Sequence, residues 1–171
     1  MRKYSSLFWY VALFLISILV DRATKFFSLR LFGPSLNSGF SAQGAAFSKV
    51  TPYKINSYLK FELLFNRGIS WGMFDSKSSL VFFFVSFFIF LITVVVALYA
   101  YQRYKQGHMI IGEVLVVAGS LSNIVDRIVY GGVIDFISLS YGAYAWPVFN
   151  IADVCIVVGA FVMMLGIWSK K

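Results

Sequence analysis

The residues from Leu80 to Ala100 form an apolar stretch in which 21 consecutive positions carry no charged side chain. A bilayer core of about 30 Å needs about 20 apolar residues to be crossed by one helix. Three further largely apolar stretches of similar length cover residues 7–28, 110–129 and 148–168. At 60% hydrophobic and 13% charged residues, the chain departs from soluble domains, which are about 45–50% apolar and about 25% charged. The sequence predicts an all-α membrane protein with four transmembrane helices in one domain, residues 1–171.

The segment from about residue 31 to residue 79 has a different character. Turn signals such as Gly33-Pro34 and Thr51-Pro52 interrupt it, and such dipeptides mark loops. Residues 59–65 and, after the third apolar stretch, residues 133–139 have strand-like composition. Gly131-Gly132 should end the third helix. We therefore expect a short extracytoplasmic region that contains β-structure.

Basic residues set the expected orientation. Four spans place both termini on one side, and the short flanks there carry Arg2, Lys3, Arg103, Lys105, Lys170 and Lys171. Positive flanks favour the cytoplasm, so we expect both termini to be cytoplasmic. We attribute the net charge of +8 to contacts with anionic membrane lipids and expect no nucleic-acid partner, because no nucleic-acid-binding motif is found. The same threading brings four aspartates to the extracytoplasmic face: Asp21, Asp126, Asp135 and Asp153.

Carboxylates within apolar sequence are functional candidates. A charged side chain near the bilayer centre costs about 2.5–3.5 kcal/mol on insertion scales. Asp126 is followed by Arg127, so a structural ion cluster and a functional role are both open for it. Asp135 and Asp153 have no basic residue within four positions, which favours a functional role. Asn123 and Asn150 each stand three residues before an Asp, the spacing of neighbours on one helix face.

Two carboxylates held close together can activate water, because one keeps a proton while the other stays ionised. Other hydrolase designs are disfavoured: His108 is the single histidine and lies in the expected cytoplasmic connection, and Cys155 is the single cysteine. No nucleotide-binding motif is present. A divalent cation bound by carboxylates stays open, although we expect no metal and no cofactor. Two alternatives are a small proton-coupled transporter that uses intramembrane Asp residues and a non-catalytic assembly protein.

The motifs around these residues resemble those of a known family. Asp126-Arg127-x-x-x-Gly131-x-Val133-x-Asp135-Phe136 and Phe149-Asn150-x-Ala152-Asp153 resemble the signature of the lipoprotein signal peptidases (signal peptidase II), which are aspartic proteases of the bacterial inner membrane. Asp21-x-x-Thr24-Lys25 and Asn66-x-Gly68-x-x-Trp71-Gly72 resemble further motifs of that family, in the same order.

The resemblance implies a function and roles for single residues. Asp135 and Asp153 match the catalytic dyad of an endopeptidase that removes the signal peptide of a prolipoprotein, just before its diacylglyceryl-modified cysteine. Supporting or substrate-binding positions are matched by Asn66, Gly68, Asn123, Asp126, Arg127, Asn150, Asp21 and Lys25. Inhibition by the cyclic peptide globomycin is also expected. The chain departs from the family at Ser122, where glycine is usual, and in a long polar stretch from Leu31 to Lys60.

Overall fold

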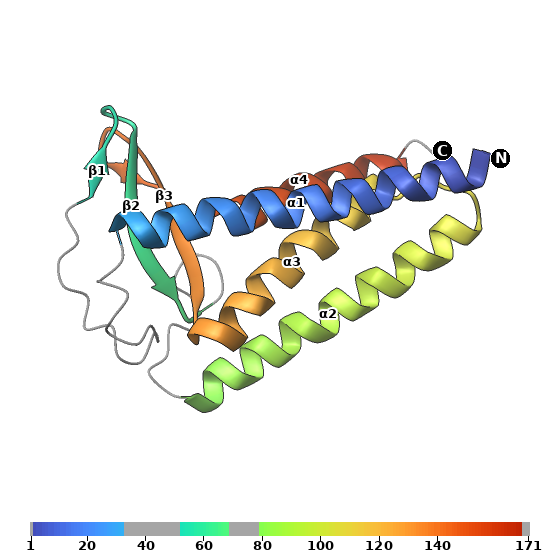
Figure 1. Ribbon diagram of the computed structural model, residues 1–171, viewed down its shortest axis with the longest axis horizontal. Helices are drawn as coiled ribbons and strands as arrows, with labels where there is room; N and C mark the ends of the chain where they lie inside the picture. Colours follow the sequence, from blue (N-terminus) through green and yellow to red (C-terminus); the bar gives the residue numbers. More distant parts are fainter. Residues whose placement is uncertain (1, 33–51, 69–78, 169–171) are drawn as a thin grey trace. The chain divides into compact units, whose positions relative to one another are not determined.

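The computed structural model of the protein describes residues 2–32, 52–68 and 79–168 (Figure 1). Its elements follow in the order α1 (Arg2–Phe32), β1 (Tyr53–Lys54), β2 (Leu59–Asn66), α2 (Ser79–Lys105), α3 (Ile111–Tyr130), β3 (Val133–Tyr141), β4 (Tyr144–Ala145) and α4 (Ile151–Trp168). The expectations for Trp71, Gly72 and most of the 31–60 stretch lie outside the described residues.

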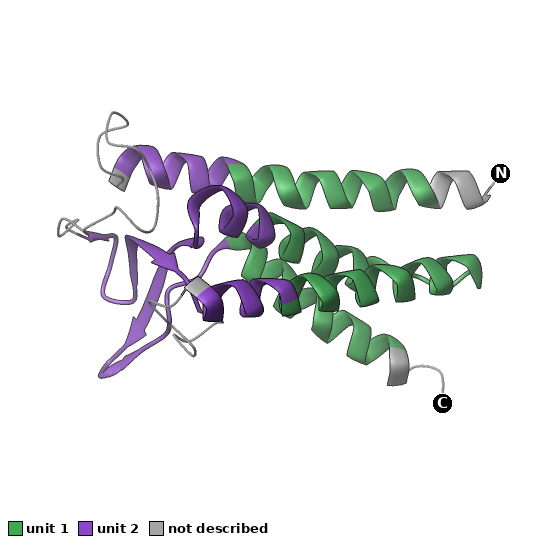
Figure 2. Ribbon diagram, turned by 90° about the horizontal axis from the view of Figure 1, so that it is seen from below, with its two compact units in different colours: residues 1–22, 88–122, 151–171 green, residues 23–87, 123–150 purple. Residues whose placement is uncertain are grey.

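The chain forms two compact units (Figure 2). Unit 1 consists of residues 1–22, 88–122 and 151–171, and unit 2 consists of residues 23–87 and 123–150. Unit 1 is helical, whereas unit 2 holds the sheet together with helical segments. The prediction of a single membrane domain stays a prediction.

Two helices are long and apolar enough to cross a membrane within the part of the chain that the structure describes. They cover Leu7–Leu31 in α1 and Leu80–Lys105 in α2. Large apolar side chains on both are exposed, for example Trp9 at 67% and Phe84 at 64%. Exposed apolar surface on this scale fits contact with lipid. The apolar run of α4, Ile151–Gly166, is shorter, so membrane crossing by α3 and α4 stays a prediction.

Within unit 1, glycines bring the backbones of α3 and α4 into contact. A Cβ atom built on Gly112 would lie 2.7 Å from the carbonyl oxygen of Gly159, and one built on Gly159 would lie 2.6 Å from the carbonyl oxygen of Gly112. A Cβ atom on Gly119 would overlap the carbonyl oxygen of Ala152. Small residues permit such close helix packing. The first turn of α4 is therefore seated directly on α3.

A buried ion pair joins the end of α2 to the start of α3 in unit 1. Nη1 of Arg103 lies 2.5 Å from Oε1 of Glu113, and the Glu113 side chain is 1% exposed. A buried charge is costly unless it is paired. This pair neutralises both charges and fixes the connection between the two helices.

Unit 2 is built on an antiparallel sheet with the strand order β1-β2-β3-β4. In its central pair Asn66 is opposite Val133 and Leu64 is opposite Asp135, with a register shift between Phe61 and Leu64. The strands expected at residues 59–65 and 133–139 are confirmed. The sheet packs through Leu63, Phe65 and Ile134 against Leu29 and Tyr130.

Two backbone features fix where α3 ends and where α4 begins. Gly131 has φ 72°, a conformation that favours glycine, and α3 ends at Tyr130, as the sequence predicts. The fourth helix begins at Ile151, three residues later than expected. The reason is that Phe149 forms backbone hydrogen bonds with Ile137 in both directions, each 2.9 Å. Asn150 consequently lies before the helix rather than in its first turn.

Candidate active site

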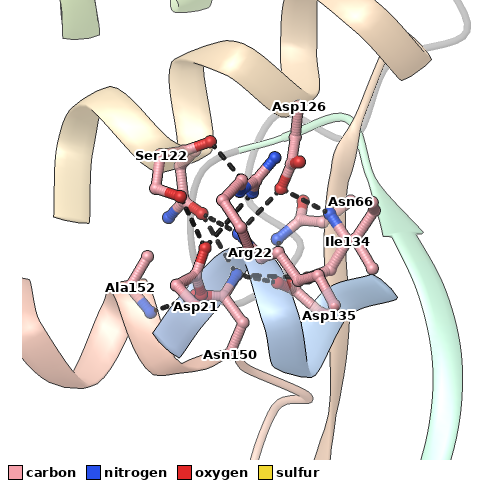
Figure 3. Close-up of polar contacts among 11 residues, drawn as sticks. Asp21, Arg22, Asn66, Ser122, Asp126, Ile134, Asp135, Asn150 and Ala152 are labelled. Atoms are coloured by element: carbon pink, nitrogen blue, oxygen red, sulfur yellow. Dashed lines mark hydrogen bonds and ion pairs between the residues drawn. The ribbon is translucent and has the colours of Figure 1, made fainter. Parts of the chain in front are cut away.

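Asp135 lies on β3, and two neutral amide groups hold its carboxylate. Nδ2 of Asn66 donates to Oδ2 at 3.0 Å, and Nδ2 of Asn150 donates to Oδ1 at 2.6 Å, as Figure 3 shows. The Asp135 side chain is 1% exposed. Asn66 is opposite Val133 in the sheet, so Asn66 and Asp135 are diagonal neighbours, which long side chains can bridge. Each oxygen of this carboxylate therefore has a fixed donor.

The two asparagines are themselves held in place. Oδ1 of Asn66 accepts a hydrogen bond from the Gly68 amide at 3.0 Å, a local turn typical of Asn. The Asn150 side chain is fully buried, and its amide nitrogen is also within 3.2 Å of Oδ1 of Asn123 and 3.3 Å of the Ile134 carbonyl oxygen. The contact with Asp135 is the shortest of the three, so Asn150 is oriented toward that carboxylate.

Asp126 forms a buried ion pair with Lys25. The Nζ atom of Lys25 lies 2.7 Å from Oδ2 of Asp126 and donates to Oδ1 of Asn123 at 2.7 Å. The same Asp126 oxygen accepts from the Ile134 amide at 3.3 Å (Figure 3). Asn123 and Asp126 thus share one helix face, as their spacing predicts. This cluster joins α1, α3 and the start of β3, directly before Asp135.

Arg127 points to the segment after β2. Its Nη2 donates to the carbonyl oxygen of Gly68 at 2.7 Å, and its guanidinium lies 5.8 Å from the ring centre of Phe82. The first contact restrains Gly68, two residues after Asn66, and the second links Arg127 to α2. Arg127 therefore fixes the segment that carries one of the amide donors to Asp135.

Asp21 belongs to a second polar cluster, in unit 1 (Figure 3). Its Oδ1 accepts from the Ala152 backbone amide at 2.8 Å. Its Oδ2 accepts from Oγ of Ser122 at 2.6 Å and from Nη2 of Arg22 at 3.2 Å. Arg22 also donates to the Ser122 carbonyl oxygen at 3.2 Å. Sequence reasoning did not identify the role of Arg22, although a basic residue next to a buried carboxylate was a usable signal.

Asp153 lies in the first turn of α4 and is partly buried. The amides of a helix N-terminus stabilise a negative charge there. Asp153 belongs to unit 1 and Asp135 to unit 2, so their pairing stays a prediction. Among the described residues, no group of three or more His, Cys, Asp or Glu side chains is placed to hold a metal ion.

A groove runs along the sheet of unit 2 and reaches Asn66. Its volume is about 460 Å³, and Leu64, Asn66, Ser138 and Trp146 are among the residues that line it. An extended peptide could lie in such a groove, because strands present main-chain hydrogen-bonding groups. Asn66, whose amide contacts the Asp135 carboxylate, is therefore one of the residues that line this groove.

Comparisons with known proteins agree with one another. The sequence model of the family described as signal peptidase (SPase) II matches residues 13–169. The lipoprotein signal peptidase of Clostridium novyi is 31% identical and covers 91% of this chain and 94% of its own length. The lipoprotein signal peptidase of Clostridium acetobutylicum is 34% identical over 91% of this chain and 90% of its own length.

A solved structure described as a bacterial membrane enzyme has the same fold. Its TM-score is 0.67 at 20% identity, and the match covers 94% of this chain and 88% of that chain. The sequence and fold comparisons cover nearly the whole chain. The chain therefore belongs to the signal peptidase II family.

Proposed function

We propose that this protein is a membrane endopeptidase that removes the signal peptide from prolipoproteins, with Asp135 and Asp153 as the catalytic carboxylates. Membership in the signal peptidase II family supports peptidase activity on prolipoproteins. The observation that carries the assignment of Asp135 is its setting: a buried carboxylate held by the neutral amides of Asn66 and Asn150. These amide donors orient both carboxylate oxygens and so hold the group in one position for proton transfer.

Asp153 is proposed as the partner of Asp135 for reasons of sequence and local structure. It stands three residues after Asn150, whose amide donates to Asp135 at 2.6 Å. It also occupies the first turn of α4, where ionised carboxylates are stabilised. These positions support a pair in which one member is ionised and the other protonated.

The proposed reaction is hydrolysis without a covalent intermediate. The ionised carboxylate takes a proton from water while the resulting hydroxide attacks the scissile carbonyl carbon. The protonated carboxyl group donates its proton to the carbonyl oxygen, which gives a tetrahedral gem-diol intermediate. The first carboxyl group then passes its proton to the amide nitrogen as the C–N bond breaks. The second carboxylate takes back a proton from a hydroxyl group of the intermediate, which restores the pair and leaves a free amine and a carboxylic acid. General acid–base catalysis of this type contributes roughly 10²–10⁴-fold per group. Asn66 and Asn150 hold Asp135 in position through both steps.

The substrate is proposed to be a diacylglyceryl-modified prolipoprotein, cut just before its modified cysteine. The exposed apolar faces of α1 and α2 suit contact with membrane lipids and with a membrane-anchored signal helix. The groove along the sheet suits the extended residues around the cleavage site. We place the protein in the bacterial inner membrane, with cytoplasmic termini and an extracytoplasmic site, and we expect globomycin to inhibit it.

The test is processing of a prolipoprotein in cells that depend on this protein. Asp135→Asn and Asp153→Asn should each cause accumulation of uncleaved, lipid-modified precursor while the protein is produced at normal levels. Glu113→Gln is the matched control, because it also neutralises a buried carboxylate, in the ion pair with Arg103. That variant should lose stability but retain cleavage per folded molecule. Normal processing by both Asp variants would eliminate the proposed function.

A further inference from the structure

The Asp21 cluster of unit 1 suggests a role for a hydroxyl group that lies outside the proposed catalytic pair. Ser122 is 1% exposed, and its Oγ donates to Oδ2 of Asp21 at 2.6 Å. That distance is typical of a charge-assisted O–H···O⁻ hydrogen bond. The other oxygen of Asp21 accepts from the Ala152 amide at 2.8 Å. Ala152 directly precedes Asp153.

We propose that Ser122 is a positioning residue for Asp153, acting through the carboxylate of Asp21. This inference rests on the proposed function of Asp153. The first amides of a helix have no partner within the helix, and Asp21 supplies one from α1. Donation by Ser122 to one oxygen of Asp21 fixes the rotation of the carboxylate, and thereby directs the other oxygen at the start of α4.

The face of α3 that carries Ser122 also packs against α4. Gly119, three residues earlier on that face, leaves room for the carbonyl oxygen of Ala152. Ala152 is fully buried. Ala152 is thus held at its carbonyl group by packing and at its amide by Asp21. Two different groups of Ala152 are fixed immediately before the residue that is proposed to be catalytic.

Three other hydroxyl side chains in the described helices donate within their own helix. Ser17 donates to the carbonyl oxygen of Leu13, Ser86 to that of Phe82 and Thr93 to that of Ile89. Each hydroxyl donates to the carbonyl oxygen four residues earlier in its own helix, which is a common hydrogen bond for Ser and Thr in helices. Ser122 instead donates to a side chain that is 101 positions away in the sequence. Its hydroxyl therefore connects α3 to the carboxylate of Asp21 on α1.

The test measures steady-state cleavage of a diacylglyceryl-modified prolipoprotein by purified protein in lipid. Ser122→Ala should lower kcat about ten-fold and change KM less than about two-fold. A ten-fold loss of kcat is the effect expected when the hydrogen bond from Ser122 to Asp21 is removed. The matched control is Ser120→Ala, another buried serine of α3, which should keep the wild-type kcat. Equal kcat values for the two variants would overturn the proposal.

A double-variant cycle separates this role from simple packing. If Ser122 acts through Asp21, Ser122→Ala should have almost no further effect on kcat in an Asp21→Asn background. A full ten-fold loss in both backgrounds would overturn the proposal. Wild-type protein that fails to cleave would instead refute the proposed function.

Hydrogen exchange provides a readout that is independent of catalysis. Ser122→Ala should accelerate exchange of the amides at the start of α4, residues 151–154, and Ser120→Ala should not. This measurement needs neither substrate nor the Asp21→Asn variant, so it tests the role of Ser122 even if that variant does not fold. Unchanged exchange in Ser122→Ala would refute the role of Ser122 in holding α4.

Discussion

Asp126 and Asp135 are two buried carboxylates of the same unit in opposite chemical settings. The two side chains are 0% and 1% exposed, respectively. Asp126 faces the ammonium group of Lys25 at 2.7 Å, whereas Asp135 is held by the amides of Asn66 and Asn150. An ammonium group and an amide N–H group both donate hydrogen bonds to a carboxylate, but only the ammonium group also supplies a counter-charge. We therefore expect a structural role for Asp126 and propose a chemical role for Asp135, although both side chains are equally buried.

The largest effect on stability is expected at the ion pair. Asp126→Asn should lower the free energy of unfolding by about 3–5 kcal/mol, because it leaves the charge of Lys25 buried without its counter-ion. Thermal or denaturant unfolding in detergent measures this. The double variant Lys25→Met/Asp126→Leu should recover most of the loss, because it removes both charges together. A single Asp126→Asn variant as stable as wild type would contradict the structural role of the pair.

A smaller effect is expected when one amide donor to Asp135 is removed. Asn66→Ala should reduce prolipoprotein cleavage about ten-fold or more, because a hydrogen bond to a charged group contributes roughly 1.5–3 kcal/mol. Purified enzyme assayed at saturating substrate provides the measurement. Asn56→Ala serves as the control, since Asn56 makes its two hydrogen bonds in an exposed turn. Equal rates for the two variants would show that Asn66 does not support the carboxylate.

The smallest effect is expected for an ion pair at the surface of the sheet. The Nζ atom of Lys60 lies 3.1 Å from Oε1 of Glu62, and the two side chains are 36% and 25% exposed, respectively. Solvent screens such pairs, so Lys60→Ala should change the free energy of unfolding by less than about 1 kcal/mol. The same unfolding assay applies. A loss of unfolding free energy as large as that of Asp126→Asn would show that the exposed pair stabilises the protein as much as the buried one.

Local sequence patterns predicted much of the fold. Apolar stretches located the helices, Gly131-Gly132 marked the end of α3, and strand-like composition located β2 and β3. The spacing of Asn123 and Asp126 also placed both side chains on one face, where Lys25 contacts both. These features depend on residues that are near one another in the sequence, so periodicity and turn chemistry are sufficient to find them.

The partners of the site residues were harder to predict. Asn150 was expected within the first turn of a helix, yet the pairing of Phe149 with Ile137 keeps it in an extended segment, where its amide reaches Asp135. Likewise, the donation from Ser122 to Asp21 depends on how α1 and α3 align. Such alignments arise from packing between distant segments, and the sequence of either segment alone does not specify them.

Asp135 and Asp153 are proposed to act as one catalytic unit, and a double-variant cycle of cleavage rates tests this most directly. Asp135→Asn, Asp153→Asn and the double variant should all lose cleavage to the same extent, because groups that act as a unit have non-additive effects. The melting temperatures of all three variants should equal that of the wild-type protein. Wild-type cleavage by either single variant, or losses that multiply in the double variant, would contradict the claim.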